Sequence, residues 1–324
     1  MTLKSYLANK LSGKKYRING LRRSDRLPSK DNLRQLFHDH MIYSADQLPS
    51  SVDLRSDMTP VEDQSQIGSW QRTLLLVRFS DHKSFIWPNL FFTGAYEYIT
   101  KKSDGNDIAV SRLFIYYNGH AKANPATITD SGCTMTDGIE GLEEFGVRLE
   151  SVWPYDISQV NTKPSEEAYQ DAAGHTITDA LQVGINLNEM KSCLAQGLPF
   201  AFGLVLFKLF AKASANGIVP YPGLTDIIQR SIGGHALLAV GYSDTSNSFI
   251  VRNSWGEDWG DKGYCYIPYK YMTHAEYCFD AWTIRKLATD DLSQGNGNND
   301  DSMNYHPANS SEENNDEDDD THTP

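Results

Sequence analysis

Apolar residues follow two different spacings along the chain. Residues 137–146 place Ile139, Leu142 and Phe145 on one helical face and end in a glycine, which is a typical helix stop. Residues 188–196 repeat this design and are also followed by a glycine. Both stretches are therefore predicted to be helices.

Continuous apolar runs are concentrated between residues 200 and 267, and such runs predict strands. Helical spacing thus lies mostly before about residue 198, and strand-like runs lie mostly after it. Such segregation predicts an α+β fold with a helical half, a sheet half and a cleft between them. The runs that we expect to be strands are residues 200–207, 235–242, 248–253 and 263–267.

The two ends of the 324-residue chain differ in charge from its centre. Residues 1–46 are polar and basic, and we expect a poorly packed arm that could act as a pro-segment. Residues 47–288 hold nearly all the apolar content and form the expected folded domain. Residues 289–324 carry eleven acids and no Lys or Arg, so we expect a disordered acidic tail.

The charge balance and the cysteines exclude several classes of function. The net charge is −13, but residues 1–288 contain 29 basic and 31 acidic side chains and are close to neutral, which offers no basic surface for nucleic acid. No signal peptide or membrane span is expected. The four cysteines form no Cys-x-x-Cys pair, which argues against a zinc site or a disulfide scaffold. We expect an intracellular monomer without metal or cofactor.

Three segments carry candidate chemistry. Residues 48–69 include Gln64 and end in Gly-Ser, residues 233–236 read Gly-Gly-His-Ala, and residues 253–256 read Asn-Ser-Trp-Gly. Together they resemble the papain-like cysteine peptidases, in the leaderless bacterial-style branch. The resemblance covers residues 48–284 and implies the two-subdomain papain-like fold, with a helical half and a β-barrel-like half.

The resemblance implies a role for each polar residue of these segments. His235, preceded by Gly234, matches the general base and acid, and Asn253 matches the amide that orients it. Trp255 would shield the hydrogen bond between them from water. Gln64, upstream of Gly68 and Ser69, matches the donor to the oxyanion.

The nucleophile is missing from this pattern. The family places its cysteine directly after Gly68-Ser69, where this chain has Trp70. An indole cannot attack a carbonyl carbon. Ser69 precedes the nucleophile position by one residue and is not expected to replace it. Cys133 matches a position where secreted relatives keep a disulfide partner, but the position of the partner cysteine is Ile67 in this chain. We therefore expect Cys133 to be an unpaired thiol that lines the cleft, in a protein of a reducing compartment. It is not expected to act as the nucleophile, because it is not at the helix N-terminus that would lower its pKa.

Residues 70–93 are foreign to the family, which places far fewer residues there. One hypothesis is a retained intron or a frame slip, because codons that are possible for residues 77–78 and 91–94 resemble the two borders of an intron. The other is an inserted aromatic loop that caps the cleft and binds a partner. Its anchors would be Phe79, Phe85, Ile86, Trp87, Phe91 and Phe92.

The function implied by the resemblance is hydrolysis of peptide bonds in peptide or protein substrates by a cysteine-type endopeptidase. Because Trp70 replaces the nucleophile, we expect the chain as written to be inactive. The alternative is a non-catalytic pseudoprotease that keeps the site to hold peptides or inhibitors. A transcript that retains every codon of residues 70–93 would favour the pseudoprotease over an error in the coding sequence.

Overall fold

The computed structural model describes residues 5–8, 13–18, 21–62, 90–123 and 133–287. Within these residues the α-helices are α1 (Leu90–Asp104), α2 (Arg112–Ala123), α3 (Met135–Phe145), α4 (Glu166–Ala172), α5 (Leu187–Ala195), α6 (Leu224–Ile228) and α7 (Tyr269–Met272). The strands are β1 (Ser5–Ala8), β2 (Lys15–Ile18), β3 (Gln35–Leu36), β4 (Ser51–Asp53), β5 (Ile177–Gln182), β6 (Phe200–Leu206), β7 (Gly233–Ser243), β8 (Ser248–Arg252), β9 (Tyr264–Pro268) and β10 (Cys278–Leu287).

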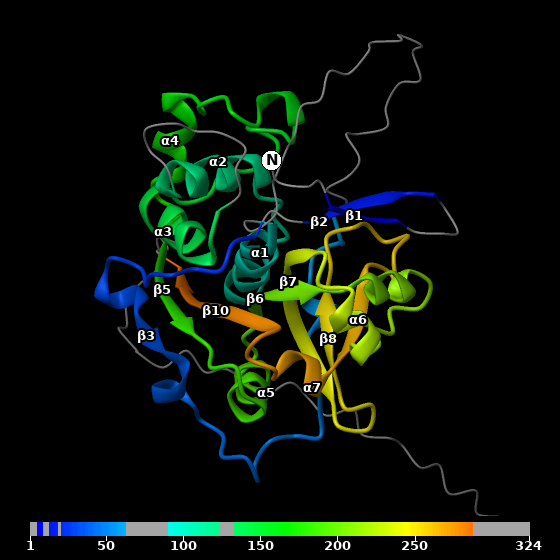
Figure 1. The fold of residues 1–324 in the computed structure, drawn as a ribbon. Coiled ribbons are helices and arrows are strands. Elements are labelled where there is room, and N and C mark those ends of the chain that lie inside the picture. The colour runs from blue at the N-terminus through cyan, green and yellow to red at the C-terminus, as the bar shows by residue number, and fades with distance from the viewer. Residues whose placement is uncertain (1–4, 9–12, 19–20, 63–89, 124–132, 288–324) are drawn as a thin grey trace, which may run out of the picture.

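An eight-stranded sheet forms the centre of the described chain, in the order β3-β5-β10-β6-β7-β8-β9, with β4 also paired to β7. Its pairs are antiparallel except for the parallel pair of β3 with β5. Figure 1 shows α2, α3 and α4 together on one side of the molecule, with α3 next to β5 and α1 near the centre beside β6 and β7. The predicted α+β architecture is confirmed.

The predicted elements match the observed ones closely. Helix α3 begins with a capping box, in which the Thr134 side chain accepts from the Asp137 N–H and the Asp137 carboxylate accepts from the Thr134 N–H. It ends at Gly146, whose φ of 68° suits glycine. Helix α5 and strands β6 to β9 lie within a few residues of their predicted bounds.

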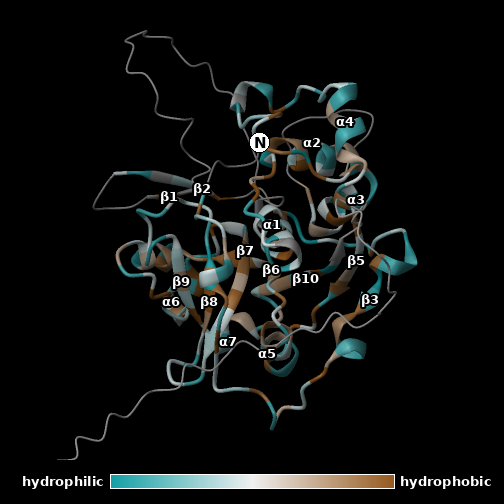
Figure 2. Cartoon of the chain, turned by 180° about the vertical axis from the view of Figure 1, so that it is seen from behind, coloured by the Kyte–Doolittle hydropathy of each residue, from teal (hydrophilic) through white to brown (hydrophobic). Residues whose placement is uncertain are grey.

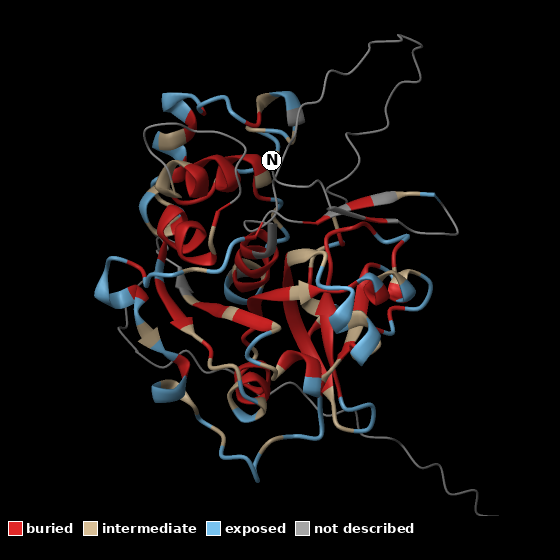
Figure 3. Cartoon of the chain, viewed as in Figure 1, coloured by how far each residue is buried: buried red, intermediate tan, exposed pale blue. Residues whose placement is uncertain are grey.

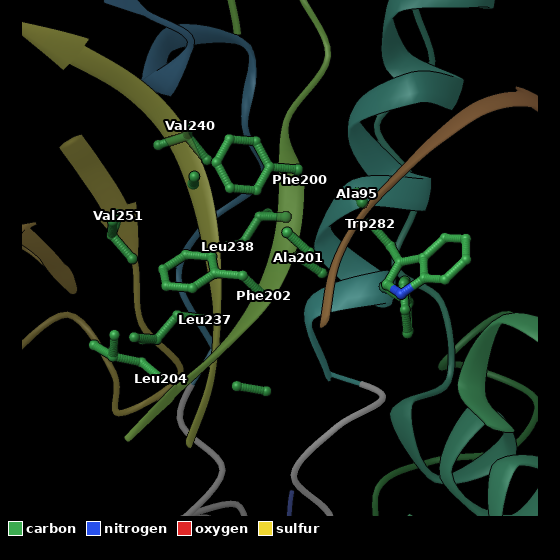
Figure 4. Packing of buried hydrophobic residues seen from close by; sticks show 14 of the residues in the cluster. Ala95, Phe200, Ala201, Phe202, Leu204, Leu237, Leu238, Val240, Val251 and Trp282 are labelled. Carbon is green, nitrogen blue, oxygen red and sulfur yellow. The ribbon is translucent and has the colours of Figure 1, made fainter. Parts of the chain in front are cut away.

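Side chains of neighbouring strands fill the core of the sheet half. Phe200 and Phe202 of β6 are fully buried and face Val251 of β8 across β7, as Figure 4 shows. On the other side, Trp282 of β10 lies toward Ala95 of α1. Each such aromatic side chain stabilises the fold by roughly 2–3 kcal/mol. Figures 2 and 3 show that the hydrophobic and buried residues follow the strands of the sheet, whereas exposed hydrophilic residues lie on the connecting loops.

The boundary between the halves is less simple than the sequence suggested. Strand β5 and helix α5 both precede residue 198, yet β5 pairs with β10 in the sheet. Its residues Ile177, Ala180 and Leu181 are buried, which joins this segment to the sheet core. The predicted division at residue 198 therefore misplaces β5, because strand pairing across the sequence depends on tertiary contacts.

The N-terminal residues pack more tightly than expected. Leu33 and Phe37 are fully buried, and β3 between them pairs with β5. The Arg26 guanidinium forms ion pairs with Asp137 and Glu140 of α3. The expectation of a poorly packed arm is wrong, because scattered apolar residues in a basic segment can still fill gaps on the domain surface.

Part of the foreign segment is helical. Helix α1 begins at Leu90, four residues before the predicted resumption of helical pattern, and Phe92 is fully buried. Phe92 is therefore not an exposed anchor of a partner-binding loop. The other predicted anchors up to Trp87 lie outside the described residues, as do the acidic tail over residues 289–324 and Trp70.

Candidate active site

His235 and Asn253 come from neighbouring strands. His235 lies near the start of β7, and Asn253 directly follows the end of β8. The two strands are antiparallel, with Leu238 opposite Arg252, so the start of β7 meets the end of β8. The His235 Nε2 atom lies 2.9 Å from the Asn253 Oδ1 atom, and both residues are buried. The structure thus brings together two of the residues that the sequence singled out.

The hydrogen bonds at Asn253 determine the tautomer of His235. The Ser254 N–H donates to Asn253 Oδ1 at 2.9 Å, which orients the amide so that this oxygen accepts. His235 Nε2 must then carry the proton and donate it to the same oxygen. The lone pair of the neutral imidazole therefore lies on Nδ1.

Trp255 covers this pair. Its indole stacks on the His235 ring, with 4.9 Å between ring centroids and an interplanar angle of 24°. Trp259 meets Trp255 edge-on at 5.1 Å, and Phe210 stacks on Trp259 at 5.8 Å. These rings keep water from the hydrogen bond between His235 and Asn253.

Burial changes the proton affinity of His235. The loss of hydration lowers the pKa of His235 to about 4, and the hydrogen bond with Asn253 only partly opposes this effect. The imidazole is consequently neutral at physiological pH, which is the state that a general base requires.

Two glycines leave room beside His235. A side chain at Gly203 would lie 2.7 Å from the Leu21 Cδ2 atom and would also collide with the Phe279 ring. A side chain at Gly234 would lie 3.1 Å from the Leu21 carbonyl oxygen. Leu21 and Phe279 therefore occupy space that only glycine at these positions leaves open. Sequence reasoning named Gly234 but missed Gly203, although a glycine inside an apolar strand run signals close packing.

N-terminal residues also cover the other side of the site. The Tyr16 ring of β2 stacks on Trp255 at 4.7 Å with an interplanar angle of 13°. Farther along, Leu21 pairs with Cys133 in a parallel bridge, and the Arg22 N–H donates to the Cys133 carbonyl oxygen at 3.3 Å. The polar composition of residues 1–46 gave no sign of these contacts.

The sequence predicts that Cys133 is a thiol that lines the cleft. It lies one residue before Thr134, the N-cap of α3. The residue is fully buried. Cys193, Cys265 and Cys278 are buried free thiols whose pKa values burial raises, so they are unreactive packed side chains.

The remaining predicted site residues, Gln64, Gly68 and Ser69, lie outside the described residues. Glu62 is the last described residue before them, and its carbonyl oxygen accepts from the Gly256 N–H at 3.1 Å.

Among the described residues there is no group of three His, Cys, Asp or Glu side chains that could hold a metal ion. In the same part of the chain, every helix is too short or too polar to cross a membrane.

Comparison with known proteins shows which family the sequence matches. The sequence pattern of the papain family cysteine proteases matches residues 125–279. An uncharacterized peptidase C1-like protein of Acanthamoeba polyphaga mimivirus is 35% identical over 197 residues, which are 58% of this chain and 62% of that protein. Cysteine proteinase 2 of Entamoeba histolytica is 28% identical over 67% of this chain and 63% of its own length. The chain spans about three fifths of the length of these relatives.

Solved structures agree with the sequence matches. Xylellain, a cysteine protease from Xylella fastidiosa, superimposes with a TM-score of 0.65 and 28% identity over 88% of this chain and 98% of its own. Digestive procathepsin L 3 of Tenebrio molitor shares the fold with a TM-score of 0.57 at 20% identity, covering 80% of this chain and 76% of that chain. Residues 125–279 of this chain thus match the papain family of cysteine proteases, and the whole described fold is similar to that of xylellain. The predicted two-subdomain papain-like fold is confirmed.

Proposed function

We propose that this chain carries the acyl-transfer site of a cysteine-type endopeptidase that acts on peptide or protein substrates. In this proposal His235 Nδ1 takes the proton of the nucleophile and later returns it to the leaving amine. Asn253 holds the imidazole through Nε2, and Trp255 excludes water. Gln64 donates to the oxyanion. The 2.9 Å contact between His235 and Asn253 beneath the Trp255 ring carries the proposal.

The chain as written lacks the atom that would begin catalysis. Trp70 follows Gly68-Ser69, and its indole offers no nucleophile for a covalent acyl intermediate. We expect the full chain neither to hydrolyse a fluorogenic peptide nor to be labelled by an epoxide inhibitor. Hydrolysis of the peptide with epoxide labelling of one residue would show that another group acts as nucleophile.

The proposed site can be tested in a variant that carries the missing nucleophilic cysteine. A variant in which a single cysteine after Ser69 replaces residues 70–89, so that helix α1 from Leu90 onward is kept, is expected to hydrolyse the peptide. Adding His235→Ala to it is expected to lower kcat at least about 10³-fold, because the general base is lost. His274→Ala, a histidine outside the site, is the matched control. Equal rates for the two histidine variants would contradict the role of His235.

The transcript separates the two explanations of Trp70. A cDNA without residues 70–93 that encodes cysteine after Ser69 would support an intron retained in the coding sequence. A cDNA with every codon present would favour the pseudoprotease, since Trp70 is then the natural residue. In that case the site would bind peptides or inhibitors without cleavage.

The N-terminal residues serve, in this proposal, as a pro-like cover. His235 is fully buried, Tyr16 stacks on the Trp255 ring that also stacks on His235, and Leu21 lies against Gly203 and Gly234. A peptide could reach the imidazole only after these residues move away. Removing residues 1–24 from the full chain is expected to allow binding of a fluorescent peptide, measured by anisotropy. The variant Leu36→Ala, at an exposed position, is the control. Equal peptide binding by the intact and shortened chains would contradict the cover.

A further inference from the structure

Arg252 is a buried guanidinium next to the site. It is the last residue of β8 and directly precedes Asn253. Its Nη1 atom donates to the Thr59 carbonyl oxygen at 2.6 Å, and its Nη2 atom donates to the Pro60 carbonyl oxygen at 2.7 Å. Only 5% of the residue is exposed, so these bonds replace the hydration that the charge loses. Arg252 therefore fastens residues 59–60 to the strand that leads into Asn253.

Helix α1 completes the surroundings of Arg252. The buried Glu97 side chain accepts from the Thr59 hydroxyl at 2.7 Å and from the Val110 N–H at 3.0 Å. Gly94, one turn earlier, lies beside Arg252, because a Cβ atom there would be in ordinary van der Waals contact with the arginine Nε atom at 3.6 Å. Thr59 therefore forms hydrogen bonds both with Arg252 of β8 and with Glu97 of α1.

Glu62, at the other end of residues 59–62, also contacts residues close to the site. The Glu62 carbonyl oxygen accepts from the N–H of Gly256, which directly follows Trp255. The Glu62 carboxylate lies 3.4 Å from the Nε atom of Arg112, the first residue of α2. Residues 59–62 are therefore attached at both ends to the strand and turn that carry Asn253 and Trp255.

We propose that Arg252 is a positioning residue, which holds residues 59–62 in register with the pair of His235 and Asn253. For its effect on the oxyanion this inference rests on the proposed function, because Gln64 follows Glu62 by two residues in the sequence. Arginine suits the task because its planar fork reaches two carbonyl oxygens at once. A lysine ammonium is a single point charge and holds this geometry less firmly.

The inference can be tested on the full chain without any cleavage assay. Arg252→Met keeps an unbranched apolar side chain that reaches as far as the arginine Nε position, but it removes the guanidinium group and its hydrogen bonds. We expect hydrogen exchange at the Gly256 N–H, which donates to Glu62, to rise at least tenfold. Exchange at the Val183 N–H, which donates to Ala281 between β5 and β10, should not change. Arg252→Lys should raise exchange at Gly256 by a smaller factor.

Arg285→Met is the matched control. Arg285 lies on β10 of the same sheet and pairs with Asp179 of β5. Its loss should raise exchange at Val183 and leave Gly256 unchanged. The ring resonances of His235 should shift in Arg252→Met and stay in place in Arg285→Met, because only Arg252 adjoins Asn253.

Two results would overturn the inference. Equal acceleration at Gly256 and Val183 in Arg252→Met would show that Arg252 only stabilises the whole fold. Unchanged exchange at Gly256 would show that it does not hold residues 59–62. If Arg252→Met does not fold, Arg252→Lys supplies the same comparison. These readouts do not depend on whether His235 acts as a base, so failure here is distinct from failure of the proposed function.

Discussion

His235 illustrates how one residue acquires its chemistry from its neighbours. The bond to Asn253 fixes the proton on Nε2, and the stacked Trp255 ring removes water from one face. Burial then keeps the imidazole neutral, with a pKa of about 4 against an ordinary value of 6.5. The burial that keeps the imidazole neutral also makes the folded state sensitive to acid.

The pH dependence of stability follows from this shift. The unfolded chain binds a proton at His235 below about pH 6.5, whereas the folded chain does so only near pH 4, so stability falls as the pH drops through this window. The contribution of His235 amounts to at most about 3 kcal/mol. In His235→Gln, the loss of unfolding free energy between pH 7 and pH 4, measured by urea denaturation, should be smaller than in the wild type.

His38→Gln is the control for this measurement, because the His38 side chain is 71% exposed. It should keep the acid sensitivity of the wild type. A wild-type profile that is parallel to that of His235→Gln across the whole window would contradict the burial argument.

At the scale of elements, helix ends show where glycine is required. Gly105 follows α1 and Gly146 follows α3, and both have positive φ angles, of 77° and 68°. A side chain at Gly105 would meet nothing within 4 Å, whereas one at Gly146 would collide with the carbonyl oxygen of Ala172, the last residue of α4. The two positions share a positive φ angle and differ in packing.

Alanine substitutions separate these two effects. Gly105→Ala should lower the free energy of unfolding by about 1 kcal/mol, which is the strain of a left-handed backbone with a side chain. Gly146→Ala should lower it by at least about 2 kcal/mol more, because α3 and the end of α4 must move apart. Thermal and urea unfolding of both variants provides the comparison. Equal losses would show that α3 and α4 separate without cost.

At the scale of the molecule, one ionic cluster ties the N-terminal residues to the helical half. Arg26 donates to Asp137 and Glu140 of α3, and the Ser29 N–H donates to Glu140 at 2.7 Å. Burial alone would raise the pKa of Glu140, but the hydrogen bonds from Arg26 and Ser29 outweigh it and lower the pKa to about 2. The stabilisation by Glu140 is therefore complete above about pH 4.5 and is lost as the pH falls toward 2.

Loosening this cluster should release the N-terminal residues. In Arg26→Ala, limited proteolysis at neutral pH is expected to cleave before residue 34 several-fold faster than in the wild type, because two buried carboxylates lose their partner. Lys30→Ala, which removes an exposed ion pair with Glu143, should leave the cleavage rate nearly unchanged. Equal rates for all three proteins would show that the cluster does not hold this segment.

The local patterns of the sequence determined much of this protein. Apolar periodicity predicted α3, α5 and four strands of the sheet, because each spacing matches one backbone geometry. The motifs around His235 and Asn253 predicted the family and the two polar residues that the fold brings into contact. The expectation that Trp70 stands where the resemblance places the nucleophile also comes from the sequence alone.

Only the tertiary structure decided which distant segments meet. The stacking of Tyr16 on Trp255, the place of Leu21 against Gly203 and the reach of Arg252 to residues 59–60 join positions far apart in the chain. Each contact depends on how strands are ordered in the sheet and on the space that small residues leave. Periodicity describes which face of an element is buried, but it carries no information about which other segment buries it.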